Sequence, residues 1–457
     1  MRNDDNKQRV SSLGLKAESY KEILNYDVLK KGSLNFFDVV KNSNKFYTIE
    51  LHKCDGYFRI STEYGRLGVT SKKDQRVAMS LDIAEKEYNK LLKGKLSKGY
   101  KEVELAQSNT GSDKAKELVN LDEVKVKKVK KVKSKLHQSV QEFVSQIYKE
   151  AQVQLNYLAV GNNDNQNSSP LGKLTVNQIN KGRSILQEIS DIINNKTHIM
   201  IDDVLELSNK YYMHIPKAFG LRISKEDVAI RTLNEINDQM NILKFYEDSL
   251  RMGNIMYNDN IDERYKQLAS DIAPLAKNTK VYKQLVDYVV NSQSRHHNVN
   301  LEVKRIFTLS QKNAPEFDDS VGNTKLLFHG TRSANLPGIL STHIKMPNQL
   351  KGVYITGAMF GPGIYFADQS TKSSQYACAR FGGNPNKFDT AFLLVSEVAL
   401  GRIKEEKNAR YHIQAPAGYD SVKGVEGSSL LHNEYIIYRE NQHQLKYIIE
   451  FQPKRRR

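Results

Sequence analysis

Four short motifs in the last third of the chain bring together an imidazole, phenols, hydroxyls and carboxylates in a fixed order. They read FHGT at 328–331, GPGIYFAD at 361–368, TKSSQY at 371–376 and NEY at 433–435. Phenol rings can enclose a flat heterocycle, and a fixed carboxylate stabilises a transition state that develops positive charge. Taken singly, each motif is explained by ordinary structure, such as a turn, a core strand or an exposed carboxylate. Four of them in order point to one catalytic site.

These motifs resemble the catalytic domain of the poly(ADP-ribose) polymerases, whose His-Tyr-Glu signature corresponds to His329, Tyr365 and Glu434. The resemblance implies an NAD-dependent ADP-ribosyltransferase, which consumes NAD as a substrate, releases nicotinamide and needs no metal. It also implies an α+β fold with a mainly antiparallel sheet. Apolar runs that are typical of strands agree with such a sheet, and they lie at 325–328, 391–395 and 434–438.

The resemblance also assigns roles to these side chains. Cleavage of the bond between nicotinamide and ribose passes through an oxocarbenium-like state, as in glycoside cleavage. The carboxylate of Glu434 would stabilise that cation and hold the 2′-hydroxyl, while Tyr365 and Tyr376 would enclose nicotinamide. The residues expected in catalysis are Glu434, His329, Tyr365 and Lys372. Those expected to bind NAD are His329, Gly330, Thr331, Asn335, Lys345, Tyr365, Ser373 and Tyr376.

Two of these assignments carry a physical expectation of their own. Gly330 has no Cβ, which would permit close approach of its backbone to the nicotinamide carboxamide, and Ser373 would add a hydroxyl. Lys372 and Met359 match positions that contact the acceptor ADP-ribose in polymerising members of the family. They favour chain growth over transfer of a single unit.

Upstream segments resemble further domains of the same family. PLGKL at 170–174 and LSNKYY at 207–212 match its helical regulatory domain, and YGR at 64–66 matches the WGR signature with Tyr64 in place of Trp. In the family, that ring packs against the end of a broken DNA duplex, and the regulatory helices restrain NAD access until DNA binds. The residues expected to contact DNA are Asn44, Tyr64, Arg66, Lys98 and Tyr100. No zinc-finger region precedes them, so the layout is similar to the short, DNA-dependent members.

Local signals predict the elements that position these residues. The run 45–51, the turn Asp55-Gly56 and the run 57–64 predict a β-hairpin. Ser80 predicts the start of a helix that Gly94 ends, and Thr175 with Gln178 has the spacing of a capping box. Further helices are predicted around 204–212 and from 227 to 250. The acidic residues of 241–248 are not expected to face the adenosine side of the NAD site.

The chain is therefore expected to be a multidomain α+β protein. Composition predicts a flexible tail at 1–20 and a basic linker at 107–135. The resemblance implies a small WGR domain of one sheet and one helix at 21–106, an all-α regulatory domain at 136–256 and the ADP-ribosyltransferase domain at 257–457. In the linker, VKVKKVKKVKSK at 124–135 disfavours a strand because like charges repel. This run would act in nuclear import, contact the DNA backbone or remain a solvated tail.

Charge and cysteine content indicate which binding partners and which cellular compartment to expect. The net charge of +17 favours a polyanionic partner, although a surface that only aids solubility explains it equally well. The two cysteines, Cys54 and Cys378, argue against a disulfide framework and a structural zinc site. No apolar run approaches the ~20 residues that cross a bilayer. We expect a nuclear protein in a eukaryotic host and a cytoplasmic one otherwise, with no membrane partner.

The sequence thus predicts a DNA-break-stimulated, NAD-dependent poly(ADP-ribose) polymerase that modifies itself and nearby proteins. Its expected partners are DNA with nicks or 5′-phosphorylated ends, and acceptor proteins. Two alternatives stay open at this point. One is a mono(ADP-ribosyl)transferase of the same fold, and the other is a catalytically inactive protein that binds DNA ends.

Overall fold

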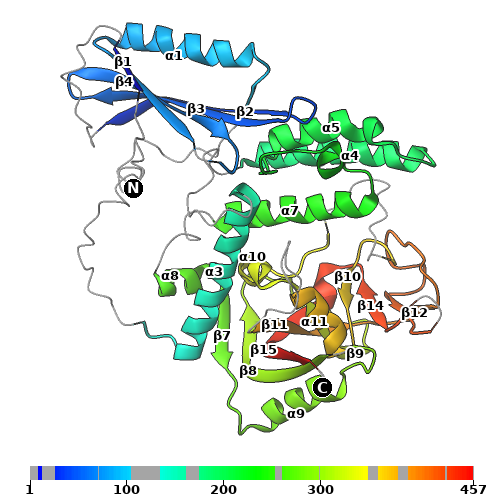
Figure 1. The fold of residues 1–457 in the computed structure, drawn as a ribbon. Helices are drawn as coiled ribbons and strands as arrows, with labels where there is room; N and C mark the ends of the chain where they lie inside the picture. The colour runs from blue at the N-terminus through cyan, green and yellow to red at the C-terminus, as the bar shows by residue number, and fades with distance from the viewer. Residues whose placement is uncertain are drawn as a thin grey trace. The chain divides into compact units, whose positions relative to one another are not determined.

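The structure of the chain is a computed structural model (Figure 1). It describes residues 9–12, 26–69, 71–103, 134–160, 174–252, 260–297, 299–347, 359–378, 390–427 and 430–455. The described residues exclude positions 107–133 of the predicted linker. They also exclude residues 170–173 of the motif PLGKL and most of the predicted tail.

The chain forms two compact units. The N-terminal unit consists of residues 1–132 and 155–239, and the C-terminal unit consists of 133–154 and 240–457. Helices α3 (Gln138–Val160) and α7 (Leu233–Met252) contribute residues to both units. The units therefore do not coincide with the predicted domain borders, because parts of the helical segment group with the catalytic sheets.

The N-terminal unit is built on a six-stranded sheet with the order β1-β5-β4-β3-β2-β6. Along this order the strands are Arg9–Ser12, Lys72–Ala78, Tyr57–Arg66, Ser43–Cys54, Asp27–Asp38 and Lys101–Glu102. Neighbours are antiparallel except that β1 runs parallel to β5. The sequence predicts a flexible tail at Arg9–Ser12. The structure differs because the backbone of edge strand β5 offers this segment hydrogen-bonding partners.

The predicted hairpin and the first helix are confirmed. Strands β3 and β4 meet at Gly56, whose φ of +79° is a left-handed conformation that glycine adopts without strain. Helix α1 (Leu81–Leu96) begins after Ser80, whose Oγ accepts from the backbone N–H of Ile83 at 3.4 Å. The helix continues past Gly94 to Leu96, since a single glycine is tolerated inside a helix. Its buried side packs on one face of the sheet (Figure 1).

The remaining helices of this unit follow in sequence. They are α4 (Val176–Asn195), α5 (Ile201–His214), α6 (Lys225–Val228) and the first part of α7. The capping box at Thr175 is present. The prediction of one helix from 227 to 250 is wrong, because α6 ends at Val228 and α7 starts anew. Glu235 accepts from the backbone N–H groups of Arg231 and Thr232 at 2.8 and 2.9 Å, which caps the new start.

Two sheets form the framework of the C-terminal unit. The five-stranded sheet has the order β7 (Ser270–Pro274), β8 (Val299–Gln311), β15 (His443–Arg455), β11 (Ala391–Ala399) and β9 (Thr324–Gly330). The four-stranded sheet has the order β10 (Ile364–Phe366), β14 (Glu434–Ile437), β13 (Ser421–Gly424) and β12 (Ile403–Glu406). Phe328 and Ala367 exchange two backbone hydrogen bonds, of 2.8 and 2.9 Å, and so join β9 to the segment after β10.

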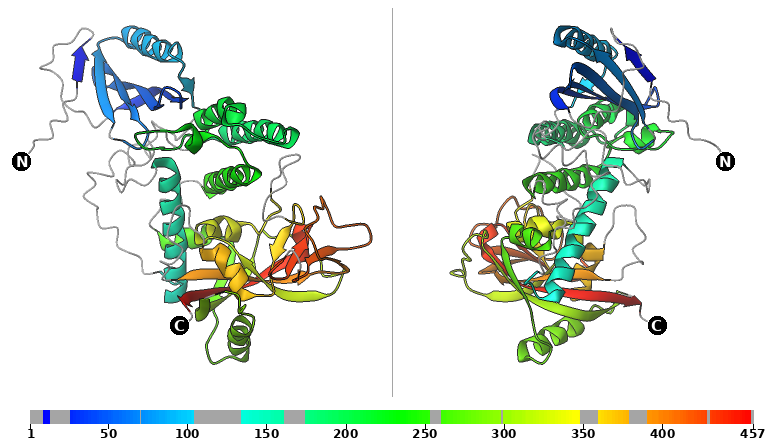
Figure 2. Two further views of the ribbon diagram at one scale, coloured as in Figure 1. Left: turned by 45° about the vertical axis from the view of Figure 1, so that its right-hand side comes forward. Right: turned by 90° about the vertical axis from the view of Figure 1, so that its left-hand side faces the viewer.

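Helices cover both faces of the five-stranded sheet. Phe307 of β8 stacks with Phe143 of α3 at a centroid distance of 5.2 Å. Ile306, the preceding residue of β8, joins the core that contains Val289 of α9 (Lys280–Asn291). Because successive residues of a strand point to opposite faces, α3 and α9 lie on opposite sides of the sheet, as Figure 2 shows. The other helices are α8 (Ile261–Gln267), α10 (Leu336–Ser341), α11 (Ser370–Cys378) and the 3-10 turns η4 (Ser333–Asn335) and η5 (Glu440–Gln442).

The fold class predicted from the sequence is confirmed. The N-terminal unit contains a sheet with one helix on it and a helical segment, and the catalytic region is α+β. In that region the sheets are antiparallel apart from the β12–β13 pair. Within the described part of the chain, no helix is both long and apolar enough to cross a membrane.

Candidate active site and nucleic-acid interface

The carboxyl end of β9 packs directly on α11 in the C-terminal unit. A Cβ at Gly330 would lie 1.8 Å from the carbonyl oxygen of Ser373 and 2.7 Å from its carbonyl carbon, so only glycine permits this packing. The sequence predicts that the missing Cβ makes room for nicotinamide. In the structure it makes room for the backbone of α11. The buried hydroxyl of Ser373 donates to the carbonyl of Phe328 at 3.2 Å and keeps its oxygen available as an acceptor.

His329 is held in one tautomer by β10. Its Nδ1 lies 2.9 Å from the carbonyl oxygen of Tyr365, and because a carbonyl only accepts, Nδ1 carries the proton. Burial lowers the pKa of His329; the bond to Tyr365 opposes this shift and the charge of Lys244 adds to it. The ring is therefore neutral at pH 7, and its Nε2 can accept a hydrogen bond from a hydroxyl group.

The ring of Tyr365 is fixed by the turn that precedes β10. Its hydroxyl donates to the carbonyl of Gly361 at 2.7 Å and accepts from the backbone N–H of Phe360 at 3.1 Å. The turn is itself constrained, since Gly361 has a φ of +86° and a Cβ there would lie 2.0 Å from the carbonyl oxygen of His412. Tyr365 is therefore positioned without help from a ligand.

Glu434 and Lys372 form an ion pair whose side chains are only 10% and 13% exposed. Oε1 of Glu434 contacts the lysine, whereas Oε2 is buried and has no hydrogen-bond partner among the described residues. The carboxylate also lies within electrostatic range of both Tyr365 and Tyr376, where it adds to burial in raising the pKa of each phenol. The structure thus brings the predicted catalytic carboxylate, lysine and two tyrosines together. The unpartnered Oε2 is an acceptor suited to a ligand hydroxyl.

The remaining predicted NAD contacts follow β9. The side-chain amide of Asn335 donates to the hydroxyl of Thr331 at 3.1 Å. Lys345 lies next to His343, whose Nε2 is 2.6 Å from a carboxylate oxygen of Glu440. This pair holds the segment that carries Lys345.

Helix α7 also reaches this side of the catalytic domain. A Cβ at Gly338 would lie 3.0 Å from Cβ of Asp248, so the two backbones are close. Lys244, one turn earlier in α7, is within electrostatic range of His329 and Lys345. From the sequence, the acidic residues of 241–248 are not expected to face the adenosine side of the NAD site. Asp248 shares a helix face with Lys244 and lies within electrostatic range of Lys345.

Asp368 is a further residue of the site to which the sequence assigns no role. Its Oδ2 accepts from the side-chain amide of Asn433 at 3.0 Å and from the hydroxyl of Tyr435 at 3.1 Å. These two residues flank Glu434, so Asp368 ties the end of the GPGIYFAD motif to the NEY motif. The motif itself is the signal in the sequence, since Asp368 is its last residue.

Comparison with known families accounts for this arrangement. Residues 279–428 match the poly(ADP-ribose) polymerase catalytic domain, residues 134–271 match the regulatory domain of that family, and residues 31–107 match the WGR domain. The chain belongs to the poly(ADP-ribose) polymerase family. Membership of this family supports NAD-dependent ADP-ribosylation by the catalytic domain. The catalytic match ends before Glu434, so the assignment of that residue depends on its geometry.

Individual polymerases agree with the family matches. The chain is 28% identical to poly(ADP-ribose) polymerase 1 of Xenopus laevis, over 92% of this chain and 45% of the relative. It is 27% identical to poly(ADP-ribose) polymerase 2 of Arabidopsis thaliana, over 93% of this chain and 74% of the relative. The chain spans about half the length of the type 1 polymerases that it matches.

The WGR domain of this chain binds the adjoining helical segment within the N-terminal unit. The Arg66 guanidinium donates to the carbonyl of Gly220 at 2.8 Å and to the carbonyl and side-chain oxygens of Asn42 at 2.7 and 2.9 Å. Asn44 donates to the carbonyl of Lys217 at 2.8 Å and is fully buried. The structure therefore contradicts a direct DNA contact for Asn44, because a fully buried side chain cannot reach a duplex. Asn44 and Arg66 instead attach the WGR domain to the regulatory segment.

Three other predicted DNA contacts gather around a lysine that the sequence does not single out. Lys95 Nζ lies 4.2 Å from the ring centroid of Tyr47 and 5.4 Å from those of Tyr64 and Tyr100. Lys98 follows just after α1 and is exposed. Tyrosine rings interleaved with ammonium groups suit a nucleic-acid surface, where rings stack on bases and cations face phosphates.

Proposed function

We propose that this protein is a DNA-break-stimulated, NAD-dependent poly(ADP-ribose) polymerase that modifies itself and nearby proteins. The observation that carries the proposal is the state of Glu434. One of its carboxylate oxygens is paired with Lys372, while the other is buried without a described hydrogen-bond partner and lies close to two phenols. Such an oxygen suits the 2′-hydroxyl of the nicotinamide ribose, and its charge stabilises the sugar cation that forms when nicotinamide leaves.

The neighbouring groups suit the rest of the NAD molecule. The neutral ring of His329 offers an acceptor to the adenosine-side ribose, and the rings of Tyr365 and Tyr376 offer walls to nicotinamide. We assign NAD binding to the full set predicted from the sequence, namely His329, Gly330, Thr331, Asn335, Lys345, Tyr365, Ser373 and Tyr376.

Two further features support polymer formation and DNA dependence. The ammonium of Lys372 lies beside Glu434, where it suits the diphosphate of an acceptor ADP-ribose. The aromatic and basic cluster of Lys95, Tyr64 and Tyr100 suits a DNA end, and Arg66 links that domain to the regulatory segment. We also propose a nuclear location in a eukaryotic host, because broken chromosomal DNA is the proposed activator.

The proposal is tested by incubating the full chain with labelled NAD. Three samples are compared, one without DNA, one with covalently closed duplex and one with duplex that carries a 5′-phosphorylated nick. We expect a ladder of modified protein, strongest with nicked DNA. A single sharp band would establish single-unit transfer instead, and no nicotinamide release with any DNA would reject the enzyme.

Glu434→Gln isolates the role of the carboxylate, since glutamine keeps the size and removes the charge. We expect elongation to be abolished while NAD still raises the melting temperature. The exposed carboxylate of Glu316 supplies the matched control, and Glu316→Gln should behave like the wild type. If Glu434→Gln lost NAD binding as well, the carboxylate would be structural.

A further inference from the structure

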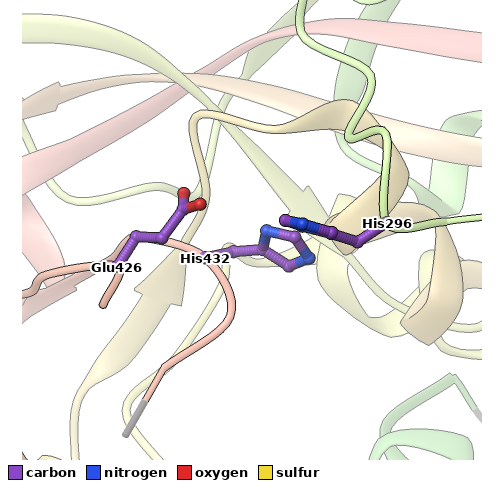
Figure 3. Close-up of side chains that lie close together, drawn as sticks. All are labelled: His296, Glu426 and His432. Atoms are coloured by element: carbon purple, nitrogen blue, oxygen red, sulfur yellow. The ribbon is translucent and has the colours of Figure 1, made fainter. Parts of the chain in front are cut away.

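A second cluster of ligand-type side chains lies beside the NEY motif, and the proposed function does not use it. His296, Glu426 and His432 each offer one ligand atom, and these atoms lie within 4.8 Å of one another. In Figure 3 the ring of His432 lies between the Glu426 carboxylate and the ring of His296. His432 is buried, at 5% exposed, whereas the other two are exposed. The cluster therefore has a fixed inner member and an open outer side through which an ion can enter.

The β13–β14 connection places Glu426 and His432 opposite each other. Strand β13 pairs with β14 so that Gly424 faces Glu434, and extending this antiparallel register by two residues brings Glu426 across from His432. The backbone N–H of Glu426 donates to Asn433 Oδ1 at 3.0 Å, which holds the two sides together. The pairing is thus a consequence of strand register.

The third member comes from the connection between α9 and β8, which is anchored to the start of α11. The backbone N–H of Ser294 donates to the hydroxyl of Thr371 at 2.8 Å, and the N–H of His296 donates to Ser294 Oγ at 3.1 Å. The backbone of Ser370 donates to the carbonyl of Ser292 at 3.2 Å. These bonds fix the backbone that carries His296, as a binding site requires.

The contacts of His432 decide which of its ring nitrogens can bind an ion. Nε2 of His432 lies 3.2 Å from Nε2 of His297, the residue after His296. Nδ1 of His432 is also buried, with no hydrogen-bond partner in the described part of the chain. Because Nε2 is hydrogen-bonded to His297, Nδ1 is the ring nitrogen of His432 that is available to a cation.

The surrounding charges permit a cation at this position. Glu426 and Asp368 are acidic groups within electrostatic range of His432, and Lys372 and His296 are basic groups within that range. Lys372 is paired with Glu434, which offsets its repulsion of an ion. Imidazole nitrogens with one carboxylate are the ligand set that zinc takes in open sites, whereas Mg²⁺ prefers oxygen ligands alone.

We propose that His296, Glu426 and His432 bind one divalent transition-metal ion with the ligand preference of zinc. The absence of a metal expected from the sequence depends on cysteine content and on the family resemblance, and neither concerns these histidines. Because His432 lies two residues before Glu434, a bound ion would fix the turn next to the proposed catalytic carboxylate.

The test is titration of the full chain with Zn²⁺ alone, after chelator treatment, by isothermal titration calorimetry. Neither NAD nor DNA is present, so the result is independent of the proposed transferase activity. We expect one Zn²⁺ per chain, and Co²⁺ should give the visible absorption of a site with nitrogen ligands. Loss of an outer partner of a metal ligand weakens binding about 10- to 100-fold. His432→Ala and Glu426→Gln should weaken it at least as much.

His198→Ala is the matched control, since His198 is exposed and belongs to the N-terminal unit. It should bind Zn²⁺ like the wild type. Glu426 is exposed, so Glu426→Gln remains informative if His432→Ala fails to fold. The proposal is overturned if the wild type binds no stoichiometric Zn²⁺, if both site variants keep wild-type affinity, if His198→Ala loses binding equally, or if Mg²⁺ competes at similar concentration.

Discussion

Replacing Gly330 with alanine tests how β9 and α11 build the catalytic site. The new Cβ would lie 1.8 Å from the carbonyl oxygen of Ser373, whereas real Cβ contacts essentially never fall below 3.0 Å. The two backbones must therefore separate by about 1.2 Å, the difference between these values. Helix α11 carries Lys372 and Tyr376, so the shift moves both away from His329. A displacement of about 1 Å costs about 100-fold in rate, or about 2.7 kcal/mol of transition-state stabilisation.

The assay is kcat/KM for nicotinamide release from NAD at saturating nicked DNA, together with thermal unfolding. The matched control is Gly94→Ala, because a Cβ at Gly94 meets nothing within 4 Å and alanine favours a helix. The control should keep full activity. If Gly330→Ala unfolded like the wild type and kept kcat/KM within about threefold of it, the close packing of β9 on α11 would not matter for catalysis.

Three further predictions concern stability and coupling. Lys372→Met should destabilise the catalytic domain by about 3 kcal/mol in urea unfolding, because it leaves the buried Glu434 carboxylate unpaired, and adding Glu434→Gln should recover most of this loss. Arg66→Ala should reduce DNA-stimulated activity more than basal activity, since it removes the hydrogen bond from the WGR domain to Gly220 of the regulatory segment and the two bonds that position Asn42; equal losses would reject this coupling role. Burial lowers the pKa of His443 from 6.5 to about 4, so the unfolded chain binds more protons between these values and stability falls as the pH drops through this range. Urea unfolding should show a loss of about 2 kcal/mol between pH 7 and pH 5, which His443→Gln should remove.

Elements that are set by residues close together in the chain can be predicted from the sequence. The turn at Gly56 and the capping box at Thr175 are set by residues a few positions away, and both are confirmed. The division between α6 and α7 has a local signal too, because TLNE at 232–235 has capping-box spacing. The apolar residues on both sides of it repeat at helical spacing, which favours one continuous helix over a break.

Features that depend on tertiary packing cannot be predicted from the sequence. Gly330 belongs to a recognisable motif, but only the fold shows that its missing Cβ accommodates Ser373. Asn44 belongs to a polar stretch of the sequence, and only the fold buries it against Lys217. The side chains of the proposed metal site come from segments far apart in the sequence, so no spacing rule identifies them.

Strand β1 has a practical consequence for work with shortened forms of this protein. Its residues, Arg9–Ser12, cover the outer side of β5, while β6 covers part of the opposite margin of the same sheet. Removing the first dozen residues would leave the outer amide and carbonyl groups of Asp74–Val77 without their neighbour. An uncovered strand recruits whatever extended segment is nearby, including the same strand of a second molecule. Trimmed samples should therefore self-associate through β5 more readily than samples that keep β1.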